Sequence, residues 1–167
     1  MRMFLYGVLG VLVVLMAIML LDRSYYEVRV VDTFEGKIED AWKVLALEYA
    51  NIHRYSEFVD SVQVLTGDDP GLGCVRRCTL ADGGFMQEEI VAWQENKELK
   101  IEIKDSSMPM VPGTSVHFHL AAMGNKIKIV AVGSYRLKYF GPLSPVIAKD
   151  EYTRLIKHLI DIVKDSV

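Results

Sequence analysis

The sequence predicts an α+β fold in which a curved antiparallel sheet of about seven strands wraps around a long C-terminal helix. Short runs of alternating apolar and polar residues, separated by turn residues, recur between residues 60 and 140 and are typical of consecutive hairpins. One long amphipathic segment follows them and predicts a helix that covers the sheet. An uncharged apolar run at the N-terminus predicts a transmembrane helix in front of this domain.

The N-terminal run divides the chain into a predicted membrane anchor, residues 1–23, and a folded domain, residues 24–167. From Met3 to Leu21 the chain has no charged residue, and this length suffices for a helix to cross the hydrocarbon core of a bilayer. The run ends without the small residues of a signal-peptide cleavage site, so we expect an anchor that is not removed. Basic residues on both sides leave its orientation open, and the very short N-terminal tail favours an extracytoplasmic domain.

The charge of the chain limits the classes of molecule that it can bind. The whole chain has a formal net charge of −3 and offers no basic face of the kind that nucleic-acid binding requires. It also lacks a cluster of Lys and Arg that would attract acidic lipids. We therefore predict no nucleic-acid partner, and since no cofactor motif is present, we predict no cofactor.

The first elements of the domain follow from a change in apolar spacing. Residues 24–33 alternate and are rich in β-branched and aromatic types, which predicts a strand. From Ile38 to Ile52 the apolar residues recur at mostly helical spacings, which predicts one helix and a short second one. Turn signals at residues 67–71, 82–84, 95–96 and 124–125 then separate the remaining runs. The predicted strands are residues 60–66, 73–81, 85–94, 97–105, 114–122 and 126–140.

The last segment, "SPVIAKDEYTRLIKHLIDIVKDSV", predicts one long helix. Ser144 can cap its start, and Pro145 suits the first helical position. An apolar stripe at helical spacing is formed by Tyr152, Leu155, Ile156, Leu159, Ile160 and Val163. The sheet is the surface that this stripe can cover. Because a curled sheet around one helix tends to leave a gap, we expect a ligand cavity between them.

Three stretches of the domain carry a resemblance to a known family. They are "IEDAWKVLALEYANIHRYSEFVDSVQVL", with Ala41 where the family has valine; "GLGCVRRCTLADGGFMQEEIVAWQENKELKIEI", with a Gly-x-x-Arg pattern and a returning glutamate; and the long final helix. They span about residues 24–165 and resemble the START/Bet v 1-like (SRPBCC) superfamily, within it the polyketide cyclase/dehydrase and lipid-transport group. The resemblance implies a helix-grip fold that encloses a hydrophobic ligand cavity. It includes no catalytic signature, so it implies the fold more than the function.

Alternation assigns the strand residues to two faces of the sheet. On residues 97–105 the apolar side chains share one face and the charged ones share the other, so the apolar face is the inner one. The same reasoning places His117 and His119 outside. The strand residues predicted to line the cavity in this way are Leu99, Ile101, Ile103, Phe118, Tyr135 and Tyr139. Leu155 and Leu159 of the final helix are predicted to face them.

Along the predicted hairpin at residues 74–90, alternation allows two phases, which place opposite sets of side chains on the inner face of the sheet. One phase is more apolar, and the family resemblance places the matching arginine on the cavity side, so we choose this phase. It leaves Arg77 and Glu89 outside. The hairpin residues then predicted to bind a ligand are Arg76, Cys78, Leu80, Met86, Glu88 and Ile90.

Arg76 and Glu88 are predicted to form a cross-strand pair. With the turn centred near Asp82, the two residues lie opposite each other. An ionised carboxylate is costly inside an apolar cavity, and a neighbouring guanidinium keeps it charged. Such a pair can anchor the polar end of a ligand, or it can be satisfied structure that never touches one.

The two cysteines do not predict a disulfide or a metal site. Cys74 and Cys78 share a face of one strand but lie about 13 Å apart at about 3.3 Å per residue, beyond the reach of a disulfide. Zinc would need further ligands on that face, and His117 and His119 point the other way. We therefore expect buried thiols and no metal.

Candidates for acid–base catalysis occur outside any diagnostic motif. They are the inner residues Glu88, Tyr135 and Tyr139, with Asp105 near the rim. His53 is interpreted as a surface or packing residue, and His158, between Lys157 and Leu159 of the final helix, as a flanking residue. Residues 106–114, rich in Pro and Met, are a possible gate at the cavity mouth, and residues 139–145 form a second possible rim loop.

Three functions stay open, in this order. The first is a membrane-anchored protein that binds or transports a hydrophobic small molecule or lipid. The second is an enzyme similar to polyketide cyclases and dehydratases, with Glu88 or a cavity tyrosine as acid or base. The third is an accessory protein that binds a partner in the membrane or outside the cytoplasm.

Overall fold

The computed structural model describes residues 2–21, 24–66, 70–139 and 141–167. The domain boundary predicted at residue 23 and the first part of the turn predicted at 67–71 lie outside these residues. The helical elements are α1 (Arg2–Leu21), α2 (Ile38–Trp42), η1 (Lys43–Leu47), η2 (Tyr49–Arg54), η3 (Gly141–Leu143), α3 (Ser144–Ile147) and α4 (Lys149–Asp165). The strands are β1 (Tyr26–Glu35), β2 (Val59–Thr66), β3 (Val75–Leu80), β4 (Phe85–Gln94), β5 (Glu98–Ser106), β6 (Ser115–Met123) and β7 (Lys126–Tyr135).

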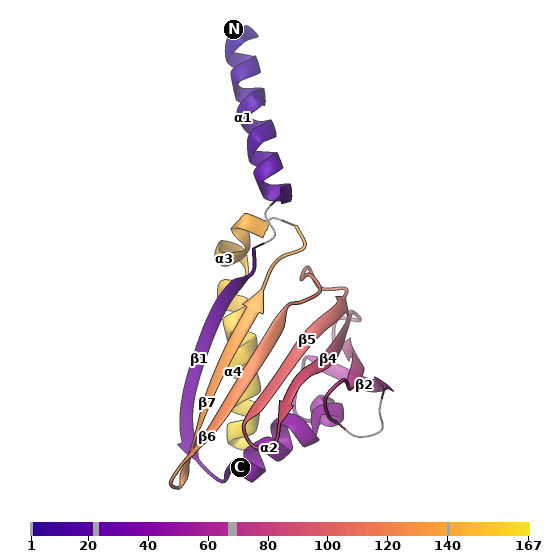
Figure 1. Cartoon of the computed structure of the whole chain (residues 1–167). Helices are drawn as coiled ribbons and strands as arrows, with labels where there is room; N and C mark the ends of the chain where they lie inside the picture. The colour runs from indigo at the N-terminus through magenta and orange to yellow at the C-terminus, as the bar shows by residue number, and fades with distance from the viewer. Residues whose placement is uncertain (1, 22–23, 67–69, 140) are drawn as a thin grey trace.

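The strands form one seven-stranded antiparallel sheet in the order β1-β7-β6-β5-β4-β3-β2. Strands β2 to β7 are joined in sequence, and β1 pairs with β7 at the far edge. The sheet curves, and α4 lies across its inner face while α2 lies at one end (Figure 1). The predicted α+β fold with a curved sheet around a C-terminal helix is therefore confirmed.

The helical segment after β1 is one continuous stretch that changes its winding. The five-residue α-helix α2 is followed by a π-helical turn, η1, and a 3₁₀ turn, η2. Trp42, Ala46 and Tyr49 are buried along it. The side chain of Trp42 packs edge-on against Trp93 of β4, with ring centroids 4.9 Å apart. The prediction of one helix and a short second one is close, but it does not include the change in winding.

The C-terminal helix begins later than predicted. Ser144 starts the separate short helix α3, and α4 follows after Ala148. Ser144 does not cap a helix; its Oγ accepts a hydrogen bond from the Leu137 backbone N–H at 3.0 Å. The prediction of a capping role for Ser144 was wrong because its side chain is buried against the chain that leaves β7.

Strand β7 ends five residues before the predicted end at residue 140, at Tyr135. Beyond it Leu137 forms an isolated bridge with Met110, so the chain turns from β6 towards the 106–114 loop. Tyr139 follows this bridge and its side chain is 65% exposed. The inward orientation predicted for Tyr139 was wrong, because the alternation of a strand no longer applies there.

The N-terminal run folds into the helix α1, which projects beyond one end of the sheet (Figure 1). Its described side chains from Tyr6 to Met16 are exposed. Among the described residues, no helix meets the length and apolarity required to cross a membrane. The helix predicted from Met3 to Leu21 is thus present, but its prediction as a transmembrane span is not supported.

Sheet and helix are in direct contact at Gly133, in the region where a cavity between them is predicted. Gly133 of β7 lies so close to α4 that an added Cβ would come within 2.3 Å of the Ile156 side chain and 2.6 Å of Tyr152. Two hollows flank α4 instead. One, of about 280 Å³, is lined by Tyr55, His158, Asp161, Ile162, Asp165 and Ser166. The other, of about 140 Å³, lies between α4 and β1, and neither is lined by a residue predicted to bind a ligand.

Candidate functional site

A buried ion pair between β3 and β4 forms the centre of the candidate site. The hairpin register places Arg76 directly opposite Glu88, as predicted. Arg76 Nε donates to Glu88 Oε2 at 2.8 Å, and Arg76 Nη2 lies 2.6 Å from the same oxygen. Both residues are buried. Because a charge without a partner is costly in an apolar interior, each side chain needs the other as its counter-charge.

Tyr49 of η2 completes this pair from the helical side. The Arg76 guanidinium lies 3.7 Å from the centroid of the Tyr49 ring, and Arg76 Nη1 donates to the Tyr49 carbonyl. The Tyr49 hydroxyl is buried and has no hydrogen-bond partner among the described residues. The sequence places Tyr49 among the apolar residues of a helix. It gives no signal that its ring lies against an arginine from another element.

Burial, and after it the Glu88 carboxylate, raises the pKa of two tyrosines of the interior. Burial raises the pKa of Tyr49 well above its ordinary value, and the Glu88 carboxylate raises it further. Burial lowers the pKa of Arg76, but Glu88 and other neighbours outweigh this effect and raise it. The pKa of Tyr152 on α4 is also raised by burial and by Glu88. The cluster therefore places a neutral tyrosine of η2 against a buried carboxylate and guanidinium.

The cysteines lie beside this cluster as buried thiols. Cys74 and Cys78 are both free and buried. The Cys78 Sγ lies 3.9 Å from Glu88 Oε2. Burial, followed by the nearby carboxylate, raises the pKa of Cys78 to about 12. The thiol thus stays protonated and can donate weakly to Glu88.

The remaining predicted ligand-binding residues differ in burial. Those that are buried are Ile90, Leu99, Ile101, Ile103, Phe118 and Tyr135. Those that are partly buried are Leu80, Met86, Leu155 and Leu159. Tyr135 packs against Tyr152, with ring centroids 4.9 Å apart, and Tyr152 donates to the Ser115 carbonyl at 2.8 Å. Tyr152 therefore links α4 to β7 through a ring contact and to β6 through a hydrogen bond.

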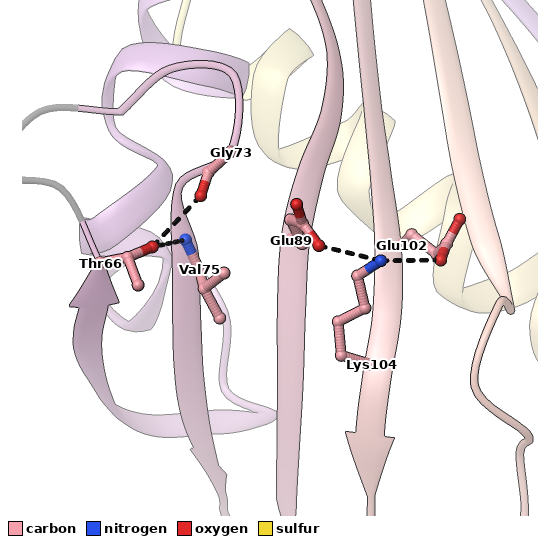
Figure 2. Close-up of polar contacts among 6 residues, drawn as sticks. All are labelled: Thr66, Gly73, Val75, Glu89, Glu102 and Lys104. Atoms are coloured by element: carbon pink, nitrogen blue, oxygen red, sulfur yellow. Dashed lines mark hydrogen bonds and ion pairs between the residues drawn. The ribbon is translucent and has the colours of Figure 1, made fainter.

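The outer face of the same hairpin holds separate ion pairs, as the chosen phase predicts. Lys104 Nζ lies 2.9 Å from Glu89 and 3.0 Å from Glu102 (Figure 2). The Arg77 guanidinium covers the Phe85 ring at 3.8 Å. Where β2 ends and β3 begins, Thr66 Oγ1 accepts from the Val75 N–H and donates to the Gly73 carbonyl (Figure 2). Sequence neighbours such as Glu88 and Glu89 thus lie on opposite faces of the sheet, one in the interior and one outside.

The other candidates for acid–base chemistry lie away from the ion pair. Asp105 is exposed on β5. His158 packs edge-on against Phe58 at 5.0 Å between ring centroids, and its Nε2 lies 3.4 Å from Ser56 Oγ. These contacts agree with a packing role for His158. Of the predicted candidates, Glu88 is the one that the structure surrounds with other polar groups.

Comparison with known families now identifies the class of protein. The family described as polyketide cyclase / dehydrase and lipid transport matches residues 26–163. The match covers nearly the whole domain, and the chain belongs to this family. No curated protein gives a significant match.

Solved structures give the same fold. The crystal structure of Ara h 8.0201 has a TM-score of 0.70 at 16% identity, covering 84% of this chain and 96% of that chain. Truncated norcoclaurine synthase from Thalictrum flavum has a TM-score of 0.68 at 13% identity, covering 84% and 92%. XoxI from Bacillus cereus has a TM-score of 0.66 at 13% identity, covering 83% and 93%. At these identities the likeness shows the fold alone.

Proposed function

We propose that this protein binds an amphipathic small molecule or lipid, whose polar end contacts the Arg76–Glu88 pair and whose apolar part lies between the sheet and α4. The observation that carries the proposal is the Tyr49 hydroxyl, which is buried beside the pair without a partner among the described residues. An unpaired buried hydroxyl costs about 1–3 kcal/mol. A ligand with a polar group at this position would remove that cost.

The family and the lining support the same proposal. Members of the family are described by cyclase, dehydrase and lipid-transport activities, which involve apolar molecules with polar groups. The inner face around the ion pair is apolar, with Ile90, Leu99 and Ile101 buried on it. Because Gly133 is in close contact with α4, the proposal requires side chains of α4 to repack when the ligand enters.

The experiment uses 8-anilinonaphthalene-1-sulfonate, a probe with an anionic group and aromatic rings. We expect saturable binding to the purified full chain, detected by probe fluorescence and by energy transfer from Trp42 and Trp93. The variant Arg76→Met/Glu88→Leu replaces both charges with apolar side chains, which keeps a fold more readily than removal of one partner. We expect it to lose affinity at least tenfold.

The hairpin supplies a matched control on its opposite face. Arg77→Met/Glu89→Leu makes the same chemical change one residue further along each strand, where the side chains lie outside. This variant should bind the probe as the wild type does. If both double variants are folded and bind the probe with equal affinity, the ligand role of the ion pair is refuted. Organic extraction of the purified chain and mass spectrometry would then identify any natural ligand.

Binding is preferred to catalysis because of how Glu88 is held. Its hydrogen bond and ion pair to Arg76 both use Oε2, the oxygen that Cys78 also approaches. This oxygen is thus already engaged by a guanidinium and approached by a thiol, which are the contacts of a side chain held within the protein. Catalysis would be indicated by turnover of an aromatic polyketide or aldehyde that Glu88→Gln abolishes while the probe still binds.

Attachment to a membrane, with the domain outside the cytoplasm, is a separate proposal. It is supported by the uncharged sequence from Met3 to Leu21 and by the exposed apolar side chains of α1. Alkaline extraction of membranes that contain the full chain tests attachment, and protease accessibility in intact cells tests the side. Release of the chain by alkali would contradict attachment.

A further inference from the structure

The outer face of the sheet carries a cluster of metal-ligating side chains that the proposed function does not use. Glu98 of β5 and His117 and His119 of β6 offer ligand atoms that all lie within 4.8 Å of one another. We propose that these three residues form a binding site for a divalent transition metal such as Zn²⁺. The site lies on the face opposite to α4 and is independent of the ligand proposal.

Strand geometry assembles the cluster. His117 and His119 are two residues apart on β6, so their side chains share one face, and their ring centroids are 4.1 Å apart. The register places Glu98 directly opposite His119. The Glu98 carboxylate reaches diagonally to His117, with Oε1 2.6 Å from Nε2. Two adjacent strands of a rigid sheet therefore hold all three ligands.

The chemistry of the three donors suits zinc. Two imidazoles and one carboxylate form a ligand set of catalytic zinc sites, in which a fourth position is left to water or another molecule. Ligand atoms around a tetrahedral Zn²⁺ with bonds of about 2.0–2.1 Å lie about 3.4 Å apart. The observed spacing between 2.6 Å and 4.8 Å brackets this value, so small rotations of the side chains suffice.

The surroundings predict an exchangeable site rather than a structural one. His119 is exposed, while His117 and Glu98 are partly buried, so a bound ion would keep contact with solvent. Lys100 lies opposite His117 on the neighbouring strand and adds a positive charge near the site. This charge opposes cation binding, and the affinity should be lower than that of a buried four-ligand site.

The test is a calorimetric titration of the untagged full chain with zinc chloride. We expect one Zn²⁺ per chain and a rise in the melting temperature on binding, because the ion links β5 to β6. His117→Ala and His119→Ala should each weaken binding by roughly tenfold or more. Glu98→Gln should weaken it as well. Cobalt substitution should give the absorption bands of a four-coordinate ion.

Controls come from the same chain. His53 and His158 are its other histidines, so His53→Ala should bind Zn²⁺ as the wild type does. Cys74→Ser and Cys78→Ser test whether a thiol takes the ion, and they should leave the affinity unchanged. Binding that survives both His117→Ala and His119→Ala, binding that either cysteine variant abolishes, or no binding by the folded wild type would each overturn the proposal.

Discussion

At the scale of single residues, Glu88 and Glu89 show that a shift of one position along a strand decides whether a charged side chain lies in the interior or outside. Glu88 lies in the interior against Arg76, and Glu89 lies outside against Lys104. Removal of one partner from a buried pair leaves the other charge without compensation. The two glutamates therefore allow a comparison in which the chemical change is the same and the environment differs.

Glu88→Gln should lower the free energy of unfolding by about 3–5 kcal/mol, because Arg76 stays buried without its counter-charge. Glu89→Gln should change it by about 1 kcal/mol or less, because its ion pair is partly exposed to solvent. Urea unfolding followed by circular dichroism measures both values. Similar losses in the two variants would contradict the assignment of Glu88 as the buried partner.

The thiols make a second residue-scale prediction. The pKa of Cys78 is raised from 9.0 to about 12, so the folded state keeps a proton that the unfolded state releases above about pH 9. Stability should therefore fall as the pH rises from about 9 to 12. Cys78→Ala should reduce this fall. A pH dependence in this range that is identical in the wild type and the variant would refute the role of Cys78.

At the scale of elements, the contact between β7 and α4 depends on a residue without a side chain. An added Cβ at Gly133 would overlap Ile156 and Tyr152. Gly133→Ala should cost about 1–3 kcal/mol of stability through overpacking, measured by urea unfolding. Gly71→Ala, where an added Cβ meets nothing within 4 Å, serves as the control. Adding Ile156→Val to Gly133→Ala should recover part of the loss, and no recovery would contradict direct overlap.

The elements also show how far the sequence predicts the structure. Alternation and helical spacing find the strands, α4 and the hairpin register, because these patterns are local and Arg76 is opposite Glu88 for any turn centred near Asp82. The end of β7 is not predicted, because it depends on a bridge between Leu137 and Met110 that the local pattern does not contain.

For the same reason, the sequence predicts only half of the candidate site. Both members of the ion pair come from one hairpin, whereas Tyr49 reaches them from η2 through the folded chain. The outer cluster is similar: His117 and His119 are adjacent by alternation, but Glu98 joins them through the pairing of β5 with β6. Spacing finds the two histidines on one strand, but a long loop separates β5 from β6, so no short turn indicates which β5 residue lies beside them.

At the scale of the whole molecule, the domain is built without α1. Among the described residues the buried core begins at Val28 and ends at Val163, and the family match covers nearly the same range. The described side chains of α1 from Tyr6 to Met16 are exposed and add little to this core. The free energy of unfolding should therefore come almost entirely from the sheet, α4 and the α2 segment.

Deletion of residues 1–23 should then leave the fold and its stability nearly unchanged. We expect the same far-ultraviolet circular dichroism from the sheet and a melting temperature within a few degrees of that of the full chain. Deletion of residues 160–167 is the contrasting variant, because it removes Ile160, Ile162 and Val163, which are buried in the core. Loss of these three buried apolar side chains, each worth about 1.5–3 kcal/mol, removes about 4.5–9 kcal/mol, which is comparable to the whole stability of a typical small domain, about 5–15 kcal/mol. This variant should therefore be largely unfolded. If the chain without residues 1–23 were the unfolded one, α1 would be a structural part of the domain.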